Sequence, residues 1–270
     1  MPGSSSALSP AATRVAGAAG AAVRQRLAST GAVGEVVHAG SHAIYARVGG
    51  RLVGLVSRGA TLTPSAVRTT LPRLPDAAPG DPASIGDGEL RVAGLAVTVA
   101  RVVPTEAPAL SDPEAAVRLL EEALLGTATA DLAPARSQLP EPALARLREG
   151  DPAAVPLLLG LGDGLTPVGD DVVAGWLVAA RSAGRPVEDV AAAVTEHAPR
   201  TTPLSASLLS DAAAGECLPE VRALLLALRA GTGIEPAVTA LAAVGHTSGR
   251  GMLLGVRLAL AGAERRGEPR

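Results

Sequence analysis

Three segments of the chain place glycines and hydroxyl side chains directly before a predicted helix. They are residues 160–171 (GLGDGLTPVGDD), residues 200–205 (RTTPLS) and residues 245–251 (GHTSGRG). The free N–H groups at a helix start attract negative charge, and glycine lets a ligand approach the backbone closely. Glycine in a helix costs up to about 1 kcal/mol relative to alanine. In this alanine-rich chain the glycines therefore indicate close approach by a ligand or by another backbone.

The first segment combines a helix start with two carboxylates. Thr166 is predicted as the N-cap and Pro167 as the first helical residue, which puts Asp170 and Asp171 in the first turn. Such a pair could hold Mg²⁺, an ion that takes one or two carboxylates and keeps several waters. The alternative is structural, because acidic residues in a first turn stabilise a helix by about 0.3–1 kcal/mol through its dipole.

The second and third segments add hydroxyls and a histidine. Thr202 before Pro203 is typical of a capped helix start, and capping alone is the stronger interpretation there. His246 is the only nearby side chain that can exchange a proton near neutral pH, and a capping or packed histidine is equally consistent.

We therefore expect catalytic roles for Asp170, Asp171 and His246, with the two aspartates also as candidate metal ligands and facing the main pocket. The residues expected to contact substrate are the glycines and hydroxyls of the three segments: Gly162, Gly164, Thr166, Gly169, Thr201, Thr202, Ser205, Thr247, Ser248 and Gly249. Arg58 is added as a candidate clamp for a substrate carboxylate, because a guanidinium binds carboxylates in a bidentate manner. Arg47, Arg51 and Arg58 are expected mostly on the surface.

Composition excludes several kinds of chemistry. All 24 basic residues are Arg, so a P-loop lysine or a lysine Schiff base is impossible. The single Cys217 excludes internal disulfides and multi-cysteine metal sites, and fits a reducing compartment. A net charge of −2 and few aromatic residues argue against a nucleic-acid partner. Without a signal peptide or an apolar run of about 20 residues, we expect a cytoplasmic protein that does not insert into membranes.

Hydrophobic patterning predicts an α+β protein: a small antiparallel β barrel or sandwich followed by an all-helical domain. Residues 1–10 read as disordered, 11–104 as the β-rich domain with a leading helix at 11–27, and 105–270 as the helical domain. Predicted strands are 34–38, 43–48, 51–57, 89–92 and 95–103, with a Gly49-Gly50 hairpin turn, and 71–82 is predicted as loop. Predicted helices are 113–125, 141–149, 167–183, 187–197, 203–214, 218–230, 235–243 and 249–264.

Three blocks, GLGDGLTPVGDD, TTPLSASLLSDAAAGE and GHTSGRGMLLG, resemble the signature blocks of a bacterial family that includes the AllH-type subunit of oxamate carbamoyltransferase. The resemblance covers most of residues 157–260, and the first block is the most specific. Asp163 stands where the family usually has Pro, Val168 where it has Ser, and Gly251 where it has Asp. The last departure bears on activity if that Asp is catalytic.

The resemblance implies transfer of a carbamoyl group between a ureido acid, such as oxalurate, and phosphate, giving carbamoyl phosphate. It also implies other subunits as partners, with a shared site as one possibility. Two alternatives stay open: a non-catalytic subunit that binds an anion or acts as a scaffold, and a stand-alone hydrolase of an amide or ureido substrate.

A single composite site requires all three glycine-rich segments to meet. That needs a break in up-and-down helix alternation, expected near residues 231–233.

Overall fold

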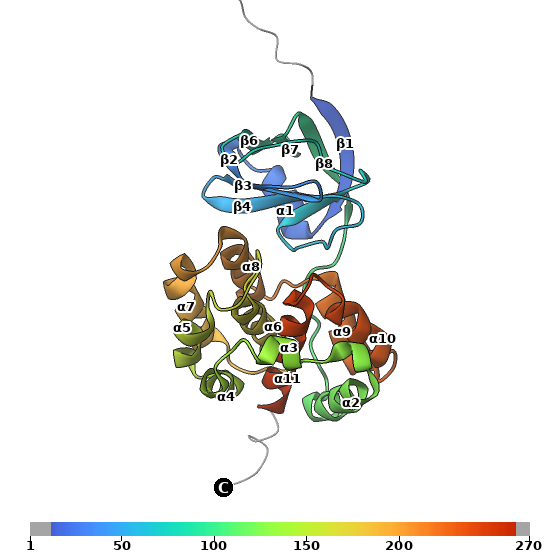
Figure 1. Cartoon of the computed structure of the whole chain (residues 1–270). Helices are drawn as coiled ribbons and strands as arrows, with labels where there is room; N and C mark the ends of the chain where they lie inside the picture. Colours follow the sequence, from blue (N-terminus) through green and yellow to red (C-terminus); the bar gives the residue numbers. More distant parts are fainter. Residues whose placement is uncertain (1–11, 263–270) are drawn as a thin grey trace, which may run out of the picture. The chain divides into compact units, whose positions relative to one another are not determined.

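The computed structural model describes residues 12–262, so the prediction for residues 1–10 lies outside the described residues. The chain divides into two compact units, with the boundary between Val103 and Pro104 (Figure 1). The first unit is a β barrel and the second is helical, which confirms the α+β class.

Eight strands close the barrel in the order β1-β5-β4-β3-β2-β6-β7-β8. Their bounds are Thr13–Ala19, Ala32–Ala39, Ala43–Val48, Arg51–Val56, Ala66–Thr69, Pro82–Gly86, Glu89–Val92 and Leu95–Val102 for β1 to β8. Two pairings are parallel, β1 with β8 and β4 with β5, and the other six are antiparallel. The barrel is thus mixed, which corrects the prediction of an antiparallel one.

The Gly49-Gly50 turn joins β3 and β4 as predicted, with Val48 paired to Arg51 and positive φ angles of 56° and 77°. Arg47, Arg51 and Arg58 are exposed, as expected. The barrel interior is aliphatic: alternate residues of each strand point inward, including Ile44, Ala46 and Val48 on β3.

The leading helix predicted at 11–27 is wrong in its first half. Residues Thr13–Ala19 form β1, and only Ala21–Leu27 form a helix, α1. Gly17 permits the close approach of β5, because a Cβ there would lie 2.6 Å from Val67 and 2.9 Å from the Arg68 carbonyl oxygen. Tertiary pairing with β5 and β8 overrides the high helix propensity of alanine. The short strands β5 and β6 were not predicted.

The helical unit contains α2 to α11. Their bounds are Pro113–Gly126 (α2), Ala133–Arg136 (α3), Glu141–Glu149 (α4), Val155–Leu158 (α5), Val168–Ser182 (α6), Glu188–His197 (α7), Pro203–Ala213 (α8), Pro219–Ala230 (α9), Ile234–Ala242 (α10) and Ser248–Ala261 (α11). Seven of the eight predicted helices are confirmed within one residue at each end. The eighth begins at Ser248, one residue before its predicted start, and its predicted end at 264 lies outside the described residues. The short helices α3 and α5 were missed because neither is long enough to show a helical period.

Helices α6 and α11 form the centre of this unit, and α6 is buried along nearly its whole length. They pack through glycine: a Cβ on Gly175 would lie 2.2 Å from the Met252 carbonyl oxygen, and one on Gly255 would lie 2.1 Å from that of Val172. The two backbones are therefore in direct contact, which sets the register between the two helix starts.

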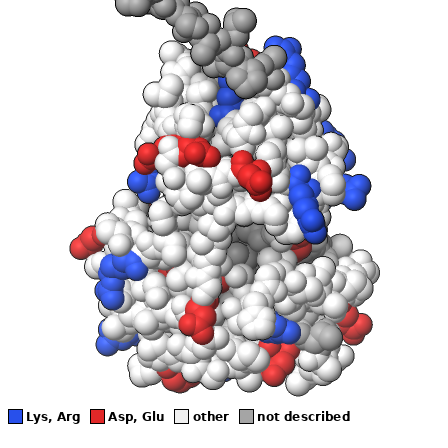
Figure 2. Space-filling view, turned by 45° about the horizontal axis from the view of Figure 1, so that its top comes forward, with Lys and Arg blue, Asp and Glu red and all other residues white. Residues whose placement is uncertain are grey.

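Charged side chains of both signs are interspersed with broad uncharged areas on the face drawn in Figure 2. Among the described residues, no helix combines the length and hydropathy needed to cross a membrane.

Candidate functional site

The starts of α6, α8 and α11 are joined by side-chain hydrogen bonds. Thr166 Oγ1 lies 2.8 Å from Ser248 Oγ, although the two residues are 82 positions apart. The Thr201 hydroxyl donates to Asp170 Oδ2, and the Thr202 hydroxyl donates to the Leu165 carbonyl at 2.9 Å. The three segments therefore contact one another, as a composite site requires. Gly231 and Gly233 lie between the second and third segments, where a break in helix alternation is expected, and both have positive φ.

Asp170 is 2% exposed and accepts hydrogen bonds on both carboxylate oxygens. The Gly160 N–H donates to Oδ1 at 2.8 Å, and Thr201 donates to Oδ2. The buried Ser205 hydroxyl lies close to this carboxylate without reaching hydrogen-bonding geometry, and it has no partner among the described residues. Burial raises the pKa of Asp170, and the hydrogen bonds from Thr201 and Gly160 oppose that rise, with a smaller contribution from the nearby Ser205 hydroxyl.

Asp171, also 2% exposed, belongs to the side of the site next to α11. Thr166 Oγ1 donates to Asp171 Oδ2 at 3.4 Å, and Ser248 lies close enough to stabilise the charged form. Burial raises the pKa of Asp171 well above its usual range. The hydroxyls of Ser248 and Thr166 oppose this rise, whereas the negative charge of Asp170 adds to it.

The start of α6 differs from the prediction in one detail. Pro167 is the N-cap, the helix begins at Val168, and no side chain caps it. Thr166 instead directs its hydroxyl to Asp171 and Ser248, so it connects α6 to α11. Thr202 does cap α8, with its Oγ1 accepting from the Ser205 N–H at 3.1 Å, as predicted.

The predicted glycines divide into two groups. Gly169 and Gly249 are buried against other backbone, since a Cβ would lie 2.0 Å from the Leu158 oxygen or 1.8 Å from the Leu241 oxygen. Close packing accounts for both. Gly162 and Gly164 lie in an exposed loop and have φ angles of 95° and 109°, values that favour glycine.

Of the remaining predicted residues, His246 and Thr247 make no hydrogen bond to either aspartate within residues 12–262. His246 is exposed, and its carbonyl accepts from Arg250 at 3.1 Å, while the described residues give its ring no hydrogen bond. Thr247 is half-buried and its side chain does not cap α11. Arg58 belongs to the barrel unit, where its backbone N–H pairs with the Leu71 carbonyl.

The two carboxylates do not form a shared cation site. Asp170 is directed to Gly160 and Thr201, and Asp171 is directed to Thr166 and Ser248. Within residues 12–262, no group of three or more His, Cys, Asp or Glu side chains is placed to hold a metal ion. Both carboxylates are thus engaged by donors of the chain itself.

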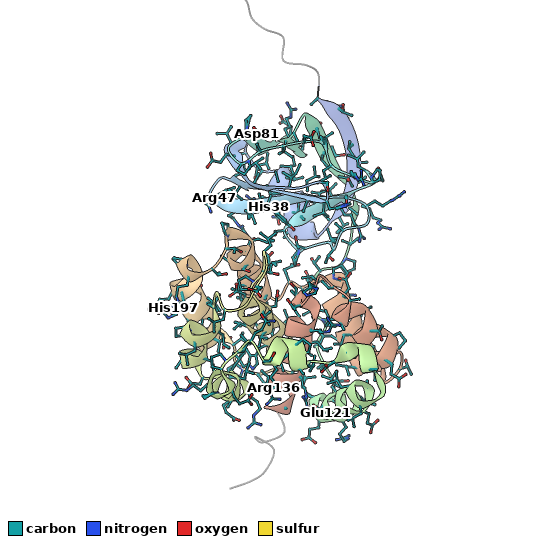
Figure 3. All side chains as sticks on the ribbon, viewed as in Figure 1. His38, Arg47, Asp81, Glu121, Arg136 and His197 are labelled. Atoms are coloured by element: carbon teal, nitrogen blue, oxygen red, sulfur yellow. The ribbon has the colours of Figure 1, made fainter. Side chains whose placement is uncertain are left out.

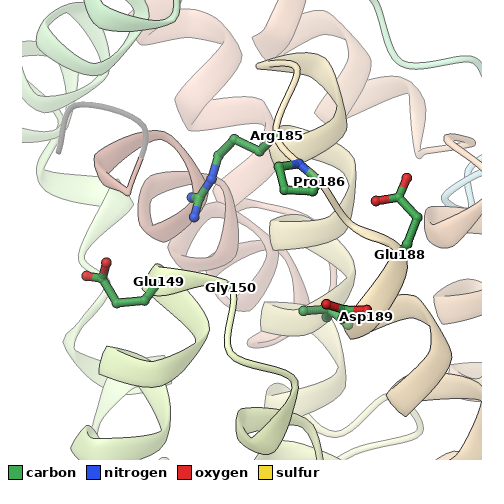
Figure 4. Close-up of a pocket in the computed structure, with 7 residues that line it drawn as sticks. Glu149, Gly150, Arg185, Pro186, Glu188 and Asp189 are labelled. Carbon is green, nitrogen blue, oxygen red and sulfur yellow. The ribbon is translucent and has the colours of Figure 1, made fainter. Parts of the chain in front are cut away.

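Three pockets of the helical unit lie at other segments. One of about 150 Å³ is lined by Glu149, Gly150, Arg185, Pro186, Glu188, Asp189 and Val190 (Figure 4). The Arg185 side chain is held in place beside this pocket. Its guanidinium donates to the carbonyls of Ala259 and Arg148, and its Cζ lies 5.3 Å from the centroid of the Trp176 ring. A groove of about 420 Å³ between α7 and α8 is lined mainly by alanine. The third, of about 220 Å³, lies beside α11.

Sequence reasoning missed several groups that hold the site together. The Gly160 N–H, the Leu165 carbonyl and the Gln138 side chain, whose Oε1 accepts from the Asp163 N–H at 3.4 Å, all contribute. Backbone groups carry no residue-type signal. Gln138 comes from the loop before α4, which no motif marks.

Residues 158–260 match a family model described as oxamate carbamoyltransferase subunit AllH, which confirms the resemblance of the sequence blocks. The matched range contains all three segments and both aspartates. It excludes the barrel and α2 to α4. No curated protein and no solved structure matched the chain.

Proposed function

We propose that this chain is a subunit of an oxamate carbamoyltransferase-type complex and that the joined starts of α6, α8 and α11 contact its substrate. One observation carries the proposal. Two buried aspartates are surrounded by hydroxyls from three separate segments, and every one of these residues lies within the range matched by the family model.

In the proposed reaction, a phosphate oxygen attacks the carbamoyl carbon of a ureido acid such as oxalurate. The carbon–nitrogen bond breaks, and the leaving amide nitrogen takes the proton that hydrogen phosphate loses. The products are carbamoyl phosphate and the amide of the acid, so atoms and charge balance. The reaction needs donors for the carbamoyl oxygen and a path for one proton.

The hydroxyls of Thr166, Thr201 and Ser248 suit a ureido group, because each can donate to a carbonyl oxygen and accept from an N–H. All three are half-buried, whereas the aspartates behind them are almost fully buried. The linked groups Asp171, Thr166 and Ser248 would connect a buried carboxyl to the surface and could hold or pass on a proton. His246, exposed in the third segment, is the proposed shuttle to solvent.

A phosphate dianion would be repelled by two ionised aspartates. The raised pKa values of Asp170 and Asp171 reduce this repulsion, because burial favours the neutral, proton-donating carboxyl. The dipoles of the three helices add partial positive charge at their starts, although the N–H groups of Gly169, Ser205 and Gly249 already donate within the chain. The electrostatics are thus compatible with an anion at the surface of the site.

A second candidate is a non-catalytic role, in which the same bonds only hold three helix starts together. The full engagement of Asp170 by Gly160 and Thr201 favours this reading for that residue. Asp171 distinguishes the two candidates, because a catalytic role requires its carboxyl for turnover, whereas a structural role requires it only for stability.

The test is the formation of carbamoyl phosphate from oxalurate and phosphate by the purified chain, alone and together with the other subunits of its complex. We expect Asp171→Asn, which keeps the side-chain shape, to lower turnover at least 100-fold while the protein stays folded. Ser182→Ala is the matched control, since Ser182 is a buried hydroxyl without a partner at the other end of α6. Full turnover by Asp171→Asn would leave the chain with the non-catalytic role, and absence of turnover in the complete complex would refute the proposed reaction.

A further inference from the structure

A cavity of about 220 Å³ between α2, α3, α4 and α11 has no part in the site described above. Its floor is apolar, and its rim is charged. The lining residues are Glu121, Arg136, Glu141, Leu144, Ala145, Arg148, Leu254, Arg257, Leu258 and Ala261. Figure 3 labels Glu121 and Arg136 on the helical unit.

Two of its three arginines are neutralised by carboxylates in bidentate pairs. Arg257 Nε and Nη2 donate to Glu121 at 2.6 and 2.8 Å. Arg136 Nε and Nη2 donate to Glu141 at 3.0 and 2.5 Å. Both pairs use the geometry in which a guanidinium binds a carboxylate most strongly, so the rim already contains two carboxylate-binding forks.

Arg148 differs from the other two. Its side chain is only 33% exposed, and it donates through Nε to the neighbouring Glu149 at 3.1 Å. Among the described residues, its two terminal amino groups have no hydrogen-bond partner. A half-buried guanidinium with both terminal groups unpaired favours an anionic acceptor, because each lost hydrogen bond to water needs a replacement.

We propose that this cavity binds a small monocarboxylate with a short aliphatic chain. The carboxylate accepts from the terminal groups of Arg148, and the chain lies on Leu144, Leu254 and Leu258. With Glu149, which Arg148 contacts only through Nε, the charges around the cavity balance, so the terminal groups of Arg148, and not a net charge, select the monoanion. The cavity is separate from the helix starts, since Arg257 lies nine residues beyond Ser248 on α11, about 14 Å along the helix at 1.5 Å per residue.

The experiment is a calorimetric titration of the full chain with pentanoate, with pentanamide as the neutral analogue of the same shape. We expect saturable binding of pentanoate, with a dissociation constant on the order of 1 mM, and no heat from pentanamide. Arg148→Met keeps the apolar stem and should weaken binding at least tenfold. Arg229→Met, a change to an exposed arginine on α9, should have no effect.

A second variant gives a change in the opposite direction. Glu121→Gln removes a negative charge from the rim and partly releases Arg257, so pentanoate should bind several-fold more tightly. Equal binding of pentanoate and pentanamide, or unchanged binding in Arg148→Met, would overturn the proposal. Should Arg148→Met not fold, weaker binding in Glu121→Gln would refute it independently.

Discussion

The substitution Gly255→Ala tests whether direct backbone contact between α6 and α11 holds the helical unit together. A Cβ at this position would lie 2.1 Å from the Val172 carbonyl oxygen and 2.7 Å from the Trp176 nitrogen. Both are backbone atoms of α6, so neither can rotate away. The distance to the oxygen has to grow from 2.1 Å to at least 3.0 Å, the lower limit for such contacts, and the helices must separate accordingly.

Two effects of opposite sign compete in this variant. Replacing a helical glycine by alanine favours the helix by about 1 kcal/mol. Overpacking a rigid core costs about 1–3 kcal/mol, and more where backbone must move. We expect overpacking to prevail, with a net loss of about 1–2 kcal/mol in the free energy of unfolding. At about 2–4 °C per kcal/mol for a unit of this size, Tm should fall by about 2–8 °C.

The assay is thermal unfolding followed by tryptophan fluorescence. Trp176 is the only tryptophan in the chain, and it is fully buried in α6, so its signal reports the helical unit specifically. Gly126→Ala is the control, because this glycine ends α2 and its added Cβ would meet nothing closer than a Glu235 oxygen at 3.5 Å. A Gly255→Ala protein as stable as the control would refute the packing argument, since helix propensity would then have decided the outcome.

Three further predictions concern the site and its surroundings. Burial raises the pKa of Asp171 above its value in the unfolded chain, so the folded state binds this proton more tightly. The free energy of unfolding should therefore decline as pH rises from about 4 through the raised pKa. Urea titrations at several pH values should show this decline, and Asp171→Asn should flatten it. Thr202→Ala removes the N-cap of α8 and should cost about 1 kcal/mol in the same titrations, whereas no loss would show that the cap bond is unimportant. Burial raises the pKa of the Cys217 thiol to about 12, so a disulfide reagent at pH 8 should label it slowly in the folded chain and rapidly after denaturation; fast labelling of the folded chain would contradict its burial.

Local signals in the sequence determined many of the element boundaries. The Asp112 side chain accepts from the Ala115 N–H at 2.8 Å and starts α2, and Gly150 and Gly231 end α4 and α9 in the left-handed conformation. Each of these depends on a cap or a φ angle within a few residues. For this reason the helices of the second unit could be located from residue types alone.

Only the tertiary structure decided the properties that depend on distant partners. Residues 13–19 are a strand because β5 and β8 pair with them, although alanine-rich sequence favours a helix. Asp170 and Asp171 do lie in one first turn, as the sequence predicted, but only the structure shows that Thr201 binds the first and Thr166 the second. The glycines of α6 and α11 were predicted to matter, but whether a ligand or another backbone approaches them depends on helix packing. Hydrogen-bond partners and close contacts between residues far apart in the chain are set by three-dimensional packing, which local propensity does not encode.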